Sequence, residues 1–337
     1  MASFLQLPHE LQEIILEYAL ITPASPPVDP WTGKENRQPL HDVDYKAWSF
    51  GPNNTLYDTS QQDDLAGTSS ALLRTSWQIH EETKGILDRM ARPCYLLDVM
   101  IVHGLELWPT WLSVPVLRTH LDEVRVTFRI FGHCISREGM RSTLGDGGHN
   151  GPEWCFYALL ERFLVHGPVT SRQPGKHQEK KVYVKTLTIN FESAADEEHP
   201  LPPPELTWKD YFRYKMRVKD GPDLSHYAMR PEWLANSLRG QIASLLALSS
   251  YTTRYGVFLY EHIGSIRVLV EGEFVEEFDL AKQLAPMKYD CDIANFSRDP
   301  SREYFWRWKR RAQRVRQEAG LPVIWADDPE FAEYPED

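Results

Sequence analysis

Cysteine is scarce in this chain and forms no pattern. The four cysteines are spread over 337 residues without CxxC spacing, so neither a disulfide framework nor a structural zinc site is predicted. Such usage is typical of a reducing compartment, and we expect a cytoplasmic or nuclear protein. The four positions are Cys94, Cys134, Cys155 and Cys291.

Long apolar runs are missing as well. The longest, such as SLLAL at Ser244–Leu248, are far shorter than the roughly twenty residues that cross a bilayer. Near the start, Pro8, His9 and two glutamates interrupt what would have to be the apolar core of a secretory signal. We therefore expect a soluble protein with no membrane partner.

Positive charge is in the minority. The chain has 37 lysines and arginines against 48 aspartates and glutamates, which gives a net charge of −11. A general nucleic-acid-binding protein needs a positive footprint to displace counterions, so nucleic acid is not an expected partner. Hydrophobic residues make up 42% of the chain, which is enough to bury a core in one large domain or two smaller ones.

The first helix is predicted to begin at Pro8, which suits a first helical turn, and to stop at Thr22-Pro23. Its apolar residues recur at helical spacing along one face. Leu16 and Leu20 lie beside that stripe and widen the apolar surface, which indicates either deep burial or a partner. The stripe consists of Leu11, Ile14, Ile15, Tyr18 and Ala19.

A second helical stripe follows within residues 69–90, either as one helix or as two short helices that meet near Thr75. Residues 21–68 separate the two helical segments. They are rich in proline and show neither a helical nor a strand period, so we interpret them as a functional loop or a disordered one. Parts of this loop are expected to pack on the domain through its aromatic residues. These are Trp31, Tyr45, Trp48, Phe50 and Tyr57.

Four strands are predicted at residues 94–102, 122–130, 184–192 and 264–272. Helices are expected between them, within part of 105–121 and from Pro152 and Pro231 onward. This alternation predicts an α+β protein in which a mixed β-sheet carries packed helices. The predicted divisions are a helical module (1–92) with an inserted loop (21–68), a target- or ligand-binding region (93–320) ending in a basic helix, and an acidic tail (321–337).

The basic helix at Ser301–Gly320 carries seven cations against Glu303 and Glu318. An apolar stripe that includes Phe305 and Trp308 predicts that one side packs on the domain and that the arginines face solvent. They could pair with the acidic excess of the chain itself, act as a nuclear-import signal, or bind an anionic partner. The candidate residues for an anionic partner are Arg307, Lys309, Arg310, Arg311 and Arg314.

Catalytic and metal-binding motifs are weak. His80-Glu81-Glu82 lacks the second histidine of a zinc-protease helix, because Lys84 occupies that position. Asp290-Cys291-Asp292 is better explained as a solvated turn, and residues 145–151 as a flexible loop. We predict no catalytic, cofactor-binding or metal-binding residue and leave enzymatic activity open. Spacing alone cannot show whether the histidines meet; those between the strands are His103, His120, His133, His149 and His166.

Two segments resemble the F-box-like proteins that are abundant in filamentous fungi. The first, LPHELQEIILEYAL from Leu7, is similar to the LPxEL opening of an F-box. The second, LLRTSWQIHEETKGIL from Leu72, is similar to the LLRTCRQIxxEAxxLL segment that follows a variable loop in that family. The resemblance covers roughly residues 4–100. It departs from the family at Trp77 and in the LDRMARPCYLL stretch from Leu87.

The resemblance implies a non-enzymatic substrate receptor. Its first helix would dock on a Skp-type adaptor of a cullin ubiquitin ligase, and the rest of the chain would hold an unknown protein target. One alternative is that the same helix packs its apolar face onto its own domain. The other is that an F-box-derived fold became a small-molecule enzyme or ligand-binding protein, in which the loop at 21–68 closes over a cavity. The residues implied to contact the adaptor are Leu7, Pro8, Leu11, Ile14, Ile15 and Leu16.

Overall fold

The computed structural model describes residues 4–32, 34, 37–39, 56–59, 67–104, 106–134, 152–168, 180–194, 198–216, 218, 220–248, 252–289 and 302–325. The described helices are the 3-10 helix η1 (Phe4–Gln6), α1 (His9–Ile21), α2 (Gly67–Leu72), α3 (Trp77–Arg89), α5 (Pro152–His166), α6 (Trp208–Lys215), α7 (Pro231–Leu246), α8 (Thr253–His262), α9 (Leu280–Leu284) and α10 (Arg302–Glu318). The described strands are β1 (Arg37–Pro39), β2 (Tyr57–Thr59), β3 (Cys94–Val102), β4 (Glu106–Ser113), β5 (His120–Phe131), β6 (Tyr183–Ser193), β7 (Ile263–Val270) and β8 (Glu273–Asp279). None of these helices is both long and apolar enough to span a bilayer.

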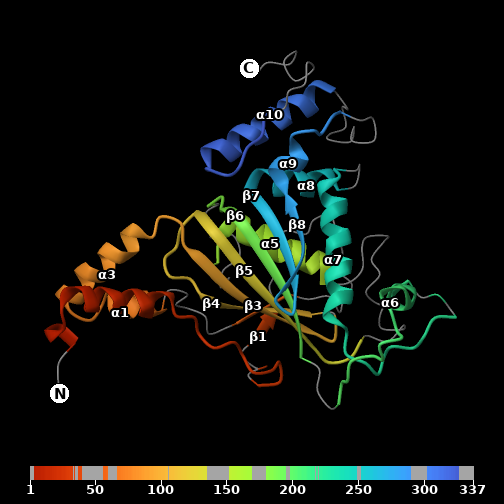
Figure 1. Cartoon of the computed structure of the whole chain (residues 1–337), viewed down its shortest axis with the longest axis horizontal. Helices are drawn as coiled ribbons and strands as arrows, with labels where there is room; N and C mark the ends of the chain where they lie inside the picture. Colours follow the sequence, from red (N-terminus) through yellow and green to blue (C-terminus); the bar gives the residue numbers. More distant parts are fainter. Residues whose placement is uncertain are drawn as a thin grey trace.

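The centre of the fold is a six-stranded sheet with the order β4-β3-β5-β6-β7-β8 (Figure 1). Strands β3, β5, β6 and β7 run parallel to one another, and β4 and β8 are antiparallel at the two edges. The predicted α+β class with a mixed sheet, an N-terminal helix and a C-terminal helix is therefore confirmed. All four predicted strands are present as β3, β5, β6 and β7.

Neither of the two edge strands, β4 and β8, is predicted from the sequence. Residues 105–121 were expected to be partly helical, and that prediction is wrong because Glu106–Ser113 forms β4. Pro109 lies within β4, where an edge strand tolerates a residue without a backbone N–H. Strand β8 is dominated by glutamates and contains a bulge opposite Val268 and Leu269, so it lacks a clear strand period.

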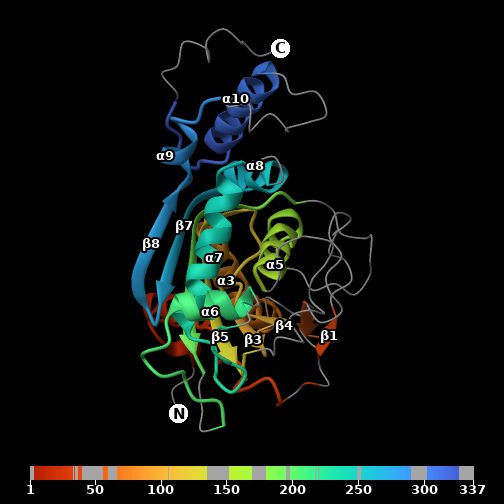
Figure 2. The same cartoon turned by 90° about the vertical axis from the view of Figure 1, so that its right-hand side faces the viewer.

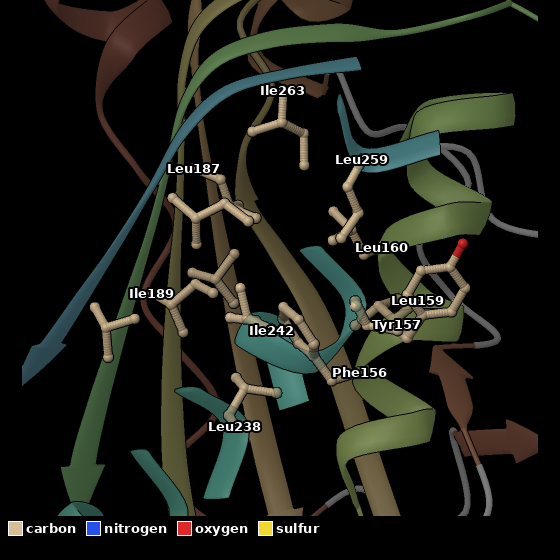
Figure 3. Packing of buried hydrophobic residues seen from close by; sticks show 14 of the residues in the cluster. Phe156, Tyr157, Leu159, Leu160, Leu187, Ile189, Leu238, Ile242, Leu259 and Ile263 are labelled. Carbon is tan, nitrogen blue, oxygen red and sulfur yellow. The ribbon is translucent and has the colours of Figure 1, made fainter. Parts of the chain in front are cut away.

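Helices cover one face of the sheet. Figure 2 shows α5, α7 and α8 together on one side of β7 and β8. The core forms where alternate strand residues meet these helices, and Figure 3 shows Leu187 and Ile189 of β6 pointing toward side chains of α5 and α7. Burying one such aliphatic side chain contributes about 1.5–3 kcal/mol. Because successive side chains of a strand point to opposite faces, the side chains between these core residues lie on the opposite face of the sheet.

The N-terminal helices have a small core of their own. Leu16 and Leu20 of α1 pack against Ile86 and Leu87 of α3, separately from the main cluster between sheet and helices. Helix α3 begins at its N-cap Ser76, whose hydroxyl accepts a hydrogen bond from the Ile79 N–H. Of the two alternatives for residues 69–90, the structure has two helices, α2 and α3, which are separated near Thr75.

Described parts of the inserted loop pack on β4 and its neighbours. The Ala24 N–H donates to the Leu112 carbonyl, and the Arg37 guanidinium donates to the Pro109 carbonyl. Leu56 is buried in the main core, and Tyr57 packs against Trp108 with ring centroids 5.3 Å apart. The loop was expected to hold no strand, and β1 and β2 correct that expectation. Tyr45, Trp48 and Phe50 lie outside the described residues.

Helix α10 packs against α8 and α9 beyond the end of the sheet (Figure 1). The predicted helix at 301–320 is confirmed with bounds Arg302–Glu318. Its residues Phe305 and Trp306 are fully buried, which explains why a helix with so many cations is stable. Of the predicted acidic tail, residues 326–337 lie outside the described residues.

Candidate functional site

The predicted adaptor-binding residues divide between two sides of α1. Leu11, Ile14 and Ile15, together with Tyr18, are between 45 and 70% exposed. These four residues follow the spacing i, i+3, i+4, i+7, so they form one continuous stripe, which we call the α1 ridge. Four large apolar side chains left in water on one helix face are typical of a surface that binds another molecule.

Leu16 does not belong to the α1 ridge. It was predicted to contact the adaptor, but it is only 3% exposed and lies in the small core with Leu20, Ile86 and Leu87. A partner could reach it only by separating α1 from α3. Of the two residues that precede the helix, Pro8 is exposed and Leu7 is half-buried.

A buried glutamine fixes the orientation of α1. Gln12 donates from its side-chain amide to the Leu7 carbonyl at 2.7 Å, and its amide oxygen accepts from Gln78 of α3 at 3.3 Å. Glu13 forms an ion pair with Arg89 at the other end of α3. Because these contacts and the Leu16 and Leu20 packing hold one side of α1, the ridge side is presented outward.

Trp77 adds a further exposed aromatic residue to this region. It is the first residue of α3 and is 80% exposed, and it directly precedes Gln78, which contacts α1. The sequence already marked Trp77 as a departure from the family pattern. This departure from the pattern was the sequence signal for a surface role of Trp77. The sequence alone did not show that its indole is exposed to solvent.

The face of the sheet opposite α5 and α7 is open across β5 to β8. In Figure 1 this face is turned to the viewer, and no described helix crosses in front of it. Sheets with a parallel centre normally have both faces covered. Here the strands alternate instead, as in β5, where buried Val124, Val126 and Phe128 alternate with Arg125 and Thr127.

A pocket of about 530 Å³ lies on this open face. Strand register places three of its four charged side chains in one row across the sheet, because Arg125 pairs with Thr188, Thr188 with Arg267, and Arg267 with Glu277. The next row along the strands contains Thr127, Asn190, Leu269 and Phe274. The pocket therefore has a charged half and a half that includes the exposed ring of Phe274. No local pattern in the sequence indicates this pocket, since its residues come from four strands spread over positions 123–277.

The carboxylates in the pocket are held by its own donors. Glu123 accepts from Arg125 at 2.8 Å and from the Thr188 hydroxyl at 2.7 Å, and Glu277 accepts from Arg267 at 3.0 Å. Partial burial raises the pKa of Glu123, but these two hydrogen bonds and the charges of both arginines outweigh it and lower the pKa overall. Glu123 is therefore ionised at neutral pH.

Three histidine rings form a row at the carboxyl end of the parallel strands. His103 follows β3 and His133 follows β5, with ring centroids 4.9 Å apart, and His133 stacks on His199 at 5.5 Å. Burial and the neighbouring histidines lower the pKa of His103. Within the described part of the chain, no group of histidine, cysteine, aspartate and glutamate has a geometry that could hold a metal ion.

The other histidines singled out in the sequence lie elsewhere. His120 packs against Tyr183 with ring centroids 5.3 Å apart, and His166 ends α5. His80 contacts the Leu73 carbonyl at 2.8 Å, which is a structural role. His149, the glycine-rich 145–151 and the segment 290–292 lie outside the described residues.

The basic helix α10 presents only part of its charge to solvent. Arg307, Arg311 and Arg314 are exposed, and Arg310 is partly so. Arg307 pairs with Glu303 at 2.7 Å and Arg311 with Glu261 at 3.1 Å, as expected if the arginines neutralise acidic groups of the chain itself.

Lys309 corrects the predicted anionic-partner site. Its side chain is fully buried and donates to the carbonyls of Ala285 and Met287, both at 2.7 Å. A cation in that position cannot meet a partner at the surface. Arg316 is buried as well and donates to the carbonyls of Tyr260 and Ile263 at the end of α8. Burial lowers the pKa of Arg316 to about 10.

No protein-family model, no curated protein and no solved structure matches this chain.

Proposed function

We propose that this chain is a non-enzymatic substrate receptor of the F-box-like type. The α1 ridge docks on a Skp-type adaptor of a cullin ubiquitin ligase, and the region from β3 onward holds a protein target. The single observation that carries this proposal is the exposure of Leu11, Ile14, Ile15 and Tyr18 on a helix whose other side is already packed and anchored.

The position of the inserted loop supports the proposal. A loop folded over α1 would obstruct docking. The described parts of the loop instead contact β3, β4 and β5, through hydrogen bonds such as Ala24 to Leu112 and Arg129 to the Pro27 carbonyl. The ridge is therefore left exposed by every described segment of the chain.

The size of the ridge is consistent with a binding contact. Burying about half of four large apolar side chains removes on the order of 200–300 Å² of apolar surface from water, which is worth roughly 5–8 kcal/mol before the cost of association. That alone gives a modest complex. Tight docking would need further contacts from neighbours such as Trp77 and Leu5, which are also exposed.

The test removes the ridge without disturbing the small core. In the variant Leu11→Ser with Ile15→Ser, both truncated residues are surface residues, so the fold should persist. We expect affinity for a recombinant Skp-type adaptor, measured by biolayer interferometry, to fall at least about thirtyfold. The matched control is Glu10→Ser with Glu17→Ser, which truncates two exposed residues of the same helix and should bind like the wild type. If the folded wild-type protein has no affinity for the adaptor, or the ridge variant binds equally well, the proposal fails.

The second candidate function is ligand binding. Its supporting observation is the pocket on the open sheet face, whose volume lies within the usual range for ligand sites. The described parts of the loop at 21–68 lie against β3, β4 and β5, whereas the pocket lies over β5 to β8. They therefore give no support to a loop that closes over this cavity.

A further inference from the structure

We infer that the pocket on the open face of β5 to β8 binds an extended segment of a partner protein, in which an acidic residue and an apolar residue stand two positions apart. This inference deepens the proposed function by naming the chemistry of the target. It does not require that α1 binds an adaptor.

The charged half of the pocket has more hydrogen-bond donors than its own carboxylates use. Arg125 uses one terminal nitrogen on Glu123, and Arg267 uses only its Nε on Glu277. Within the described residues, the other guanidinium nitrogens of these two side chains make no hydrogen bond, whereas both oxygens of Glu123 are engaged. Because charged guanidinium donors remain, the complementary ligand group is an acceptor that carries negative charge.

The net charge of the pocket selects the kind of anion. Two arginines and two glutamates line it, so their formal charges cancel. A dianionic phosphate placed between the arginines would also lie close to two carboxylates, which disfavours it relative to a singly charged group. A side-chain carboxylate carries the smaller charge and matches the fork of a guanidinium.

The second half of the pocket supplies the apolar contact. Leu269 and Phe274 lie in the row next to Arg125, Thr188 and Arg267, and Phe274 is 63% exposed. The two rows are separated by two residues along the strands, which is about 7 Å. In an extended chain, side chains on one face repeat at the same interval of two residues. A peptide that lies along the strands can therefore place a carboxylate on the arginines and an apolar side chain on Phe274 at once.

The architecture favours a polypeptide as the occupant. Parallel strands almost always have both faces covered by protein, and here one face is uncovered in the described chain. A partner segment that lies along the strands, over the pocket on β5 to β8, would cover part of that face. A ligand that fills the pocket must contact the charged row and the apolar row at the same time. A small anion can contact only the charged row, whereas a peptide can contact both.

The experiment uses a fluorescein-labelled probe peptide with Glu-Ser-Leu inside a short Ser/Thr/Gly sequence, titrated with the full chain and followed by fluorescence anisotropy. We expect saturable binding with a Kd below about 1 mM. Replacing Glu by Gln, or Leu by Ser, in the probe should weaken binding at least about fivefold, since each removes one of the two contacts. Replacing Glu by phosphoserine should not strengthen it.

Protein variants locate the site. Arg125→Gln with Arg267→Gln should weaken binding of the Glu-Ser-Leu probe at least about tenfold. Phe274→Ser, at an exposed position of the edge strand β8, should weaken it about threefold or more. The control Lys185→Gln removes a cation from the same sheet outside the pocket and should leave binding unchanged.

Three outcomes would overturn the inference. They are the absence of saturable binding up to about 1 mM protein, equal binding by the double arginine variant, and a phosphoserine probe that binds about tenfold more tightly than the glutamate probe. None of these variants touches α1, so a failure here with adaptor binding intact would disprove only the target site. The opposite pattern would disprove only the adaptor docking.

Discussion

Two cations of α10 that look like surface residues in the sequence lie in the interior. Lys309 and Arg316 are both fully buried, and their partners are backbone carbonyls of the chain. These carbonyls belong to Tyr260 in α8, to Ile263 at the start of β7, and to residues 285 and 287, so no local pattern indicated them. Buried charge of this kind is stable only when such acceptors are in place.

The buried role of Lys309 can be tested by removing its charge. Lys309→Met keeps the length of the side chain but leaves the carbonyls of Ala285 and Met287 without their donor, so we expect a loss of about 2–4 kcal/mol in the free energy of unfolding. Urea denaturation measures it. Arg314→Met, at an exposed position of the same helix, should change stability by less than about 0.5 kcal/mol. Equal effects of the two substitutions would show that Lys309 is not the interior anchor described above.

The choice between the two sides of α1 was also beyond the sequence. Periodicity identified the stripe of Leu11, Ile14 and Ile15, and it placed Leu16 and Leu20 beside that stripe. It could not say which side meets α3, because the position of α3 depends on contacts more than sixty residues away, such as Gln12 with Gln78. In the structure Leu11, Ile14 and Ile15 are exposed and Leu16 is buried, so Leu16 is not available to an adaptor, and contact of the other three with an adaptor stays a prediction.

At the scale of elements, the sequence predicted best where local signals are strong. Strands β3, β5, β6 and β7 are rich in β-branched and aliphatic residues, and α10 has a clear apolar stripe. Strand β4 was missed because of its proline, and β8 because of its glutamates, and both are edge strands that tertiary pairing stabilises. The pocket could not be predicted because it depends on the register of four strands.

The contact between α7 and α8 depends on a glycine. A Cβ at Gly256 would overlap the Leu245 carbonyl oxygen of α7, so Gly256→Ala forces the two helices apart. We expect a loss of at least about 2 kcal/mol in the free energy of unfolding. Gly240 is the matched control, since it lies within α7 with open space around it, and Gly240→Ala should stabilise the protein by about 0.5–1 kcal/mol. Thermal unfolding of the two variants should shift in opposite directions, and a shift of both in the same direction would contradict the packing described.

At the scale of the whole molecule, the α1 ridge and the pocket are two exposed surfaces that lie on different hydrophobic clusters of the described chain. The α1 ridge belongs to the small core of the N-terminal helices, and the pocket belongs to the large sheet core. Figure 1 shows α1 and α3 to one side of the sheet and α10 beyond one end of it. This arrangement would allow one surface to hold an adaptor while the other holds a target, because neither needs the residues of the other.

We propose above all that the α1 ridge binds another polypeptide. Hydrogen–deuterium exchange of the full chain, with and without a recombinant Skp-type adaptor, tests it most directly, because docking slows exchange where the partner lies. We predict that exchange becomes slower across residues 7–18 and that the exchange rates of β5 to β8 and α10 do not change. Unchanged exchange across α1 in the presence of saturating adaptor, or protection confined to another surface, would contradict it.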